Sequence, residues 1–413
     1  MTKELLLKYF KGSFFLNLPT AVNTIITLIS LPIVLASLPM DDYGKWQFVL
    51  AIETWFVTLS AQNITTASKR GIAKGLDGTF LYAFRIRAKL LLAVGILVIG
   101  LAFYFRFTGK DVLFQLTLIV GVYLGFGFLF QPSLSEFMVA KERFMSLGYL
   151  QISIFSVSMI GATVIAYFTK SIVYFVLFQL AGNSIVSLAG LVYIVIKYKL
   201  IVSYQRGDID KDCIPYGLKM IPVDLITVTA GKLSNFIIGP FWGFADLAVF
   251  SVASRLRDKF AMVIKSARPL MYADFARIEE KELAKKINKY IVHLGELGLV
   301  ISVLLVIFGS LYIRFFLPEK FIPAIKYMII LSLGLPAGVI SIVLHSMLET
   351  HLLYKQVRIA VVVPNIIKVL LILIFGYIMK TTGICIAVAL SGWISLFVYY
   401  LLIFNKRIST RFR

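Results

Sequence analysis

Long apolar segments recur along the chain at regular intervals, with short polar stretches between them. Each is close to the roughly 20 residues that an α-helix needs to cross the hydrocarbon core of a bilayer. The pattern predicts an all-α integral membrane protein with about twelve transmembrane helices. These expected spans lie near residues 14–38, 44–65, 87–105, 112–132, 147–168, 171–196, 217–239, 246–270, 291–316, 322–348, 357–379 and 382–404.

One long polar break divides the expected spans into two sets of six. It covers residues 197–216 and separates an N-lobe, residues 1–196, from a C-lobe, residues 217–413. The turns at residues 38–44 and 240–246 are both short, acidic and marked by Pro and Gly. They suggest a parallel six-plus-six repeat, although chance similarity of two short turns is an alternative. We therefore expect two six-helix lobes around a central polar cavity.

The composition agrees with a chain that lies mostly within a membrane. Of the 413 residues, 59% are hydrophobic and 15% are charged, whereas a soluble domain carries roughly 25% charged residues. The net charge of +21 follows from the loops: with the N-terminus inside, cytoplasmic segments hold 29 of the 42 Lys and Arg residues and external loops hold 8. This bias predicts that both termini and the linker are cytoplasmic. No nucleic-acid partner is expected.

Eight charged residues fall deep inside the expected spans. A charged residue at a helix centre costs roughly 2.5–3.5 kcal/mol, so that eight facing lipid would cost on the order of 20 kcal/mol. That sum exceeds the stability of a typical protein, so most of them must line a wet cavity or pair with one another. The set is Glu53, Asp224, Lys232, Arg255, Arg257, Asp258, Lys259 and Lys368.

The eighth span carries the densest group of these charges. At 100° per residue, Arg255, Asp258 and Lys259 share about 100° of arc, and Arg257 points to the opposite side. Five of the eight deep charges are positive and three are negative. This excess favours an anionic substrate over a cationic drug. The alternative for each residue is a buried ion pair that fixes helix packing.

Polar residues on two other spans extend this pattern. Asp224 and Asn235 lie on one stripe of the seventh span, with Lys232 at its edge. Asn365 and Lys368 lie one turn apart on the eleventh span. These residues are further candidates for the wall of a polar cavity.

The sequence gives no support for catalysis. The three histidines lack metal-ligand spacing, and no phosphate-binding Gly-x-x-x-x-Gly-Lys-Ser/Thr loop is present. Every expected external loop is too short to hold a catalytic domain. We expect no enzyme activity, no metal and no cofactor.

Three groups of short motifs carry a family likeness. The first pairs Lys11-Gly12-Ser13 with Asp42-Tyr43-Gly44-Lys45-Trp46. The second is Thr66-Ala67-Ser68-Lys69-Arg70-Gly71-Ile72-Ala73. The third runs from Asn235-Phe236-Ile237-Ile238-Gly239 to Ala248-Val249-Phe250-Ser251-Val252-Ala253-Ser254-Arg255-Leu256. In these stretches the chain resembles the polysaccharide transporter family, the Wzx-type O-antigen flippases of the multidrug/oligosaccharidyl-lipid/polysaccharide exporter superfamily.

The resemblance implies a MATE-like transporter that opens alternately inward and outward in the bacterial inner membrane. Its substrate would be a polyprenyl-diphosphate-linked oligosaccharide, moved from the inner to the outer leaflet. Membrane lipids and other polysaccharide-assembly proteins would be its partners, and a monomer is expected. A lipid II or teichoic-type flippase, a cation-coupled drug exporter of the same superfamily and a membrane glycan polymerase are the alternatives.

The same resemblance suggests roles for the deep polar residues. Relatives often carry Asp where Asn235 stands, which argues against ion coupling at this position. The expected substrate-binding residues are Arg255, Lys259, Lys232, Lys368, Asn235 and Asn365. The residues expected to balance charge or carry a coupling ion are Glu53, Asp224 and Asp258.

Overall fold

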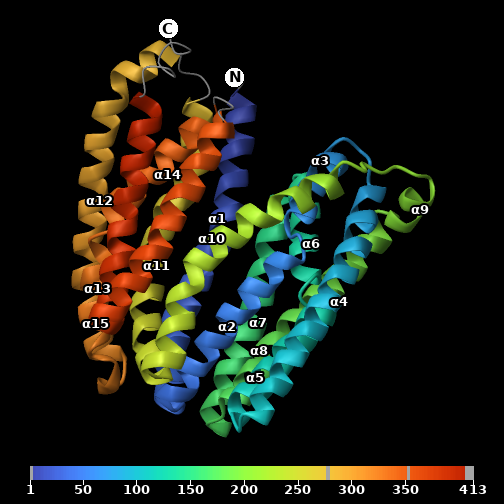
Figure 1. Cartoon of the computed structure of the whole chain (residues 1–413). Helices are drawn as coiled ribbons and strands as arrows, with labels where there is room; N and C mark the ends of the chain where they lie inside the picture. Colours follow the sequence, from blue (N-terminus) through green and yellow to red (C-terminus); the bar gives the residue numbers. More distant parts are fainter. Residues whose placement is uncertain (1–2, 276–279, 351–353, 405–413) are drawn as a thin grey trace. The chain divides into compact units, whose positions relative to one another are not determined.

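The computed structural model describes residues 3–275, 280–350 and 354–404 (Figure 1). In these ranges the regular structure is helical and no strand occurs. The helices are α1 (Lys3–Ser37), α2 (Met40–Leu59), α3 (Asn63–Ala73), α4 (Gly78–Phe107), α5 (Asp111–Phe126), α6 (Phe130–Ala140), α7 (Phe144–Thr169), α8 (Ile172–Lys197), α9 (Leu200–Gln205), α10 (Cys213–Trp242), α11 (Phe244–Phe275), α12 (Glu280–Phe316), the 3-10 helix η1 (Glu319–Phe321), α13 (Ala324–Ser332), α14 (Leu335–Thr350) and α15 (Tyr354–Phe404).

The expected spans all fall on these helices. Within the described ranges, seven helices are long and apolar enough to cross a membrane, or up to nine candidates if each bent pair, α5 with α6 and α13 with α14, counts as one span. The three remaining expected segments are α2 with α3, which is broken; α11, which is rich in charge; and the second half of α15. The all-α, multi-pass membrane fold class is confirmed.

The chain forms two compact units, Met1–Val228 and Thr229–Arg413. The boundary lies inside α10, so this helix contributes to both. The lobe limits at residues 196 and 217, and the cavity expected between the lobes, stay predictions.

Unit 1 is built from α1 to α9 and the first half of α10. Its strongest helix contacts join α4 with α5 and α7 with both α1 and α8. A buried apolar cluster that includes Phe80, Leu134, Phe137 and Leu191 joins α4, α6 and α8. Gly109, with φ +71°, closes the turn between α4 and α5, where a left-handed backbone favours glycine.

Unit 2 contains the rest of α10 and α11 to α15. The long α15 folds back at Lys380, whose φ of 52° and ψ of −138° are not helical. Ala360 and Tyr399 belong to one buried cluster, yet a straight helix would hold them about 58 Å apart at roughly 1.5 Å per residue. The eleventh and twelfth expected spans are therefore the two limbs of α15.

The polar segment at residues 274–289 is described only in part. Its C-terminal residues continue into the span, because α12 begins at Glu280 and runs without interruption to Phe316. Residues 276–279 lie outside the described residues.

Candidate functional site

The short helix α3 is the centre of a polar network in unit 1. It follows a break at residues 60–62, where Ala61 has φ +51° and interrupts what the apolar pattern predicted as one span. This break turns the polar sequence of α3, Asn63–Ala73, into a separate helix of 11 residues. Its side chains then contact α4, α6 and α10.

Asp224 of α10 is held by α3. The Asn63 side chain donates a hydrogen bond of 2.5 Å from Nδ2 to Oδ2 of Asp224. Two turns earlier on the same face of α10, Gly217 lies so close to α3 that an added Cβ would be 2.6 Å from the backbone nitrogen of Ile64. The missing side chain at Gly217 therefore permits the approach that brings Asp224 and Asn63 together.

Arg87 is a buried cation that the sequence analysis missed. It is only 1% exposed, and its Nη1 donates to Oγ1 of Thr65 on α3 at 2.7 Å. The apolar pattern predicts a span that begins at residue 87, but α4 begins at Gly78, so Arg87 lies well inside the helix. The helical period could have indicated its burial. Arg85 and Lys89 are exposed on one face of α4, and Arg87 lies on the opposite face.

Glu136 of α6 completes the network. Its carboxylate lies 2.8 Å from the Lys69 ammonium and accepts a hydrogen bond of 3.3 Å from the Thr66 hydroxyl. Glu136 also attracts Arg87 electrostatically. The sequence pattern could not pair Lys69 with Glu136, because they are far apart in sequence and meet only when α3 packs on α6.

The linker after α8 is fastened to the same end of unit 1. The backbone N–H of Asp210 donates to Oγ1 of the fully buried Thr79 at 2.8 Å, and the Asp210 carboxylate lies 3.6 Å from Nε of Arg70. An added Cβ at Gly71 would lie 2.7 Å from Cβ of Asp210. Together these contacts hold the linker against α3 and the start of α4.

Unit 2 carries a different set of charges, concentrated on α11. Arg255 and Lys259 lie one turn apart, are both half-buried, and repel one another electrostatically. The exposed fraction of the Asp258 side chain is 63%, so this carboxylate is not buried against the two cations. The expected grouping of these three residues on one arc of α11 follows from the helix geometry.

Arg257, for which the apolar pattern indicates no role, lies among these charges. Its guanidinium lies 3.8 Å from the Asp258 carboxylate, and its side chain is 25% exposed. Both Arg257 and Asp258 act electrostatically on Lys368 of α15. Lys368, on the first limb of α15, therefore lies within electrostatic range of two charged residues of α11 that are far from it in sequence.

The remaining candidates are half-buried. Asn365 donates from Nδ2 to the Val361 carbonyl one turn earlier, at 2.9 Å, so its amide nitrogen is occupied by its own helix. Lys232 and Asn235 lie on the unit 2 part of α10, and Glu53 lies on α2. Their binding roles stay predictions.

The described side chains contain no cluster of three or more His, Cys, Asp or Glu residues suited to a metal ion. The site is therefore described by its cations, carboxylates and amides.

The fold is similar to that of several solved membrane transporters. The structure matches an inward-facing multidrug resistance MATE family transporter of the MOP superfamily, with a TM-score of 0.71, 13% identity and coverage of 96% of this chain and 95% of that one. A MATE transporter from Vibrio cholerae gives a TM-score of 0.60 at 11% identity, covering 98% of both chains. The chain therefore has the MATE fold, as expected.

A third match is a MOP superfamily transporter from Pyrococcus furiosus, described as having a binding pocket of reverse polarity that suggests a different function. Its TM-score is 0.65 at 12% identity, covering 97% of this chain and 96% of that one. A search of curated proteins by sequence gives no match. The family model described as polysaccharide biosynthesis protein matches residues 47–326, and the chain belongs to this family.

Proposed function

We propose that this protein is a flippase that moves a polyprenyl-diphosphate-linked oligosaccharide, such as an O-antigen or capsule repeat unit, from the inner to the outer leaflet. It would act in the bacterial inner membrane, as a monomer with both termini cytoplasmic and without enzyme activity. Membership in a polysaccharide biosynthesis family and the MATE fold support transport of a polysaccharide precursor.

The observation that carries the proposal is the charge of unit 2. Its deep set contains five cations and one carboxylate, namely Lys232, Arg255, Arg257, Lys259, Lys368 and Asp258. A diphosphate is strongly anionic, and arginine binds phosphate through two parallel donors. A cationic drug would be repelled by such a set, which argues against the drug-exporter alternative.

The mechanism follows from the chemistry of the substrate. Its sugars and diphosphate cannot enter hydrocarbon, because charged groups lose several kcal/mol or more of hydration there. Arg255 and Lys259 would hold the diphosphate or acidic sugars, with Lys232, Lys368, Asn235 and Asn365 as further contacts. The lipid tail would remain in the bilayer while the two lobes alternate in access. Glu53, Asp224 and Asp258 would balance charge or carry a coupling ion.

A vesicle assay tests the proposal directly. The purified chain is reconstituted with a fluorescent lipid-linked oligosaccharide, and a membrane-impermeant quencher reports which molecules are in the outer leaflet. We expect the protein to expose the protected inner pool, whereas protein-free vesicles keep it protected. A labelled phosphatidylcholine should remain protected in the same vesicles. Movement of both lipids would indicate a nonspecific scramblase and would contradict the proposal.

The alternatives predict different results in this assay. Uptake of a cationic dye, without movement of the oligosaccharide lipid, would assign a drug exporter. Preference for lipid II over the lipid-linked O-antigen or capsule repeat unit would indicate a lipid II or teichoic-type flippase. Elongation of the glycan chain would assign a polymerase.

Reporter fusions test the proposed topology. Fusions at Arg413 and beside Asp208 should both report a cytoplasmic position, because Lys and Arg gather in the loops on that side. An external signal at either site would overturn the orientation.

A further inference from the structure

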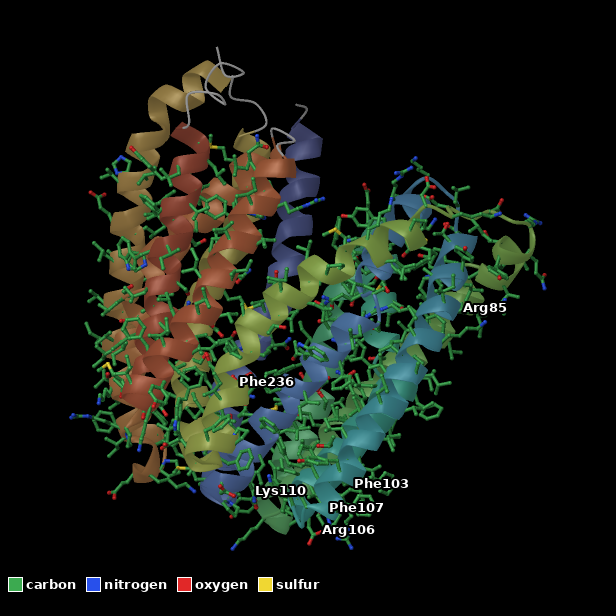
Figure 2. All side chains as sticks on the ribbon, in the orientation of Figure 1. Arg85, Phe103, Arg106, Phe107, Lys110 and Phe236 are labelled. Atoms are coloured by element: carbon green, nitrogen blue, oxygen red, sulfur yellow. The ribbon has the colours of Figure 1, made fainter. Side chains whose placement is uncertain are left out.

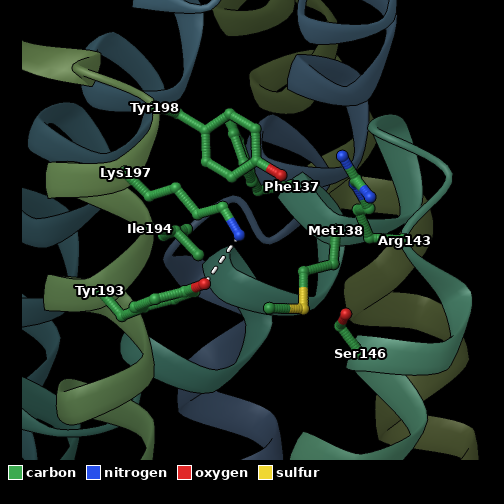
Figure 3. Close-up of a pocket in the computed structure, with 8 residues that line it drawn as sticks. All are labelled: Phe137, Met138, Arg143, Ser146, Tyr193, Ile194, Lys197 and Tyr198. Atoms are coloured by element: carbon green, nitrogen blue, oxygen red, sulfur yellow. Dashed lines mark hydrogen bonds between the residues drawn. The ribbon is translucent and has the colours of Figure 1, made fainter.

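A small pocket lies where two membrane-spanning helices of unit 1 end. It is lined by Phe137 and Met138 of α6, by Arg143 and Ser146 at the start of α7, and by Tyr193, Ile194, Lys197 and Tyr198 at the end of α8. Figure 3 shows the Lys197 amine and the Tyr193 hydroxyl directed into it from α8, with Arg143 and Ser146 on the opposite wall. Apart from the apolar cluster that contains Phe137, the pocket shares no residue with the contacts described above.

The lining of this pocket has the chemistry of an anion site. Its eight residues include two cations, three hydroxyl groups and no carboxylate. The Lys197 ammonium donates to the Tyr193 hydroxyl at 2.7 Å and lies 5.0 Å from the centre of that ring. This contact fixes the cation at the mouth of the pocket and leaves two of its three N–H donors for a ligand.

The position of the pocket along the helices indicates its depth in the membrane. Arg143 immediately precedes α7 and Lys197 is the last residue of α8, and both helices are long and apolar enough to span. The pocket therefore lies at a membrane interface. Lys141, two residues before Arg143, pairs with Asp77 at 2.5 Å in the α3–α4 turn. This contact places the pocket at the end of unit 1 that carries the linker.

The outer faces of the same helices continue the site toward hydrocarbon. Tyr149 and Val157 lie about one and three turns along α7 on the face that carries Ser146, and each is 54% exposed. On α8, Ile185 is 68% exposed. An anion held between Arg143 and Lys197 would thus lie next to surfaces suited to acyl chains.

We propose that this pocket binds the phosphate of an anionic phospholipid in the leaflet on the linker side. Arg143 and Lys197 would hold the phosphate oxygens, the Ser146 hydroxyl would donate to them, and the acyl chains would lie along α7 and α8. The attraction of Lys and Arg to anionic lipids is general, but two cations and a serine hydroxyl gathered in one pocket give it a location. This inference is independent of the proposed flippase function.

The test measures binding of phosphatidylglycerol to the purified full chain by native mass spectrometry, with phosphatidylcholine as the comparison lipid. Arg143→Ala with Lys197→Ala should weaken the tightest phosphatidylglycerol site by about tenfold or more, because charge-assisted hydrogen bonds are lost. The pair Arg143→Lys with Lys197→Arg should keep binding within about threefold, because both charges remain. Retained binding by this pair also shows that changes at these positions leave the protein folded.

A matched control separates the pocket from diffuse attraction. Lys74 and Lys89 are exposed residues of unit 1 outside the pocket, and changing both to Ala removes the same charge. Equal weakening by the control pair, or unchanged binding in the pocket variant, would overturn the proposal. Inorganic phosphate is tested as a competitor at matched concentration. If it displaces the lipid fully, the pocket recognises soluble phosphate and the lipid assignment is wrong.

Discussion

Unit 1 and unit 2 both place charged side chains on helices that belong to the membrane fold, but the balance of positive and negative charge differs between the two sets. In unit 1 the charges meet partners on other helices: Asp224 meets Asn63, and Glu136 meets Lys69. In unit 2, Arg255 and Lys259 repel one another. Asp258 lies near Arg257 and attracts Lys368 electrostatically.

This difference separates two uses of charge inside a membrane protein. A buried group with a hydrogen-bonding partner fixes how helices pack, and removing it lowers stability. Cations in excess over carboxylates are costly to keep in place, so a folded protein that retains them has a use for their charge. We therefore expect variants of unit 1 to change stability, and variants of unit 2 to change transport.

The largest effect is expected from the cations of α11. Arg255→Ala with Lys259→Ala should lower transport of the lipid-linked oligosaccharide by at least about 100-fold, because two charge-assisted contacts of roughly 1.5–3 kcal/mol each are lost. Membrane abundance should stay near that of the unchanged protein, since relief of their mutual repulsion offsets lost packing. Export and abundance are measured in the same cells.

Two further variants refine this prediction. Arg255→Lys alone should recover only part of the activity, because it keeps the charge and loses the paired donors. A packing role predicts the reverse pattern: low abundance in Arg255→Ala, restored when Asp258→Ala is added. Normal export in a well-expressed Arg255→Ala variant would remove Arg255 from the substrate site.

The next effect concerns the buried cation of unit 1. Arg87→Ala should lower the free energy of unfolding by about 3 kcal/mol, because a large buried side chain and its hydrogen bond to Thr65 are removed. Thermal unfolding in detergent measures the change. The matched control is Arg85→Ala, two residues away on the exposed face, where Figure 2 labels it. It removes a contact of 4.3 Å with the Tyr204 ring and should cost about 0.5–1 kcal/mol.

The outcome for Arg87 also tests the distinction between the units. If Arg87→Ala unfolds at the same temperature as the unchanged protein but no longer transports, the α3 network belongs to the substrate path. Unit 1 would then share the function that we assign to unit 2.

A smaller loss is expected where α10 crosses α3. Gly217→Ala should destabilise by about 1–3 kcal/mol, the usual cost of overpacking, because its Cβ would meet the backbone of Ile64. Gly161→Ala on α7 is the control, since no atom lies within 4 Å of the added Cβ. That change should be neutral or slightly stabilising, because alanine favours a helix. Equal melting temperatures for both variants would show that the α3–α10 approach is looser than described.

The smallest effect is expected from Asp224→Asn. The new amide keeps an oxygen that can accept from Asn63, so stability should fall by less than about 1 kcal/mol, the difference between a charged and a neutral hydrogen bond. Export at matched abundance should remain above half. A complete loss of export with normal stability would assign the coupling ion to Asp224, whereas retained export leaves Asp224 with charge balance alone.

The apolar pattern predicted much of the fold because membrane spans are a local property. A run of about 20 apolar residues must form a helix in lipid, whatever its neighbours are. All twelve expected segments are accordingly helical, and the fold class follows from them. Charges within spans, such as Arg255 and Lys368, could be identified from the sequence for the same reason, because each interrupts a local apolar run.

The tertiary structure alone decided where helices break and which polar groups meet. The number of apolar residues does not predict the break between α2 and α3. This break depends on the left-handed backbone of Ala61, which the surrounding packing maintains. Arg87 is buried within α4 because this helix begins nine residues earlier, at Gly78. Glu136 forms an ion pair with Lys69 because α6 packs on α3. Such contacts join residues far apart in sequence, and their energies depend on the folded neighbours. A single sequence therefore determined which segments enter the membrane, and the packed helices determined which of their charges hold the fold together.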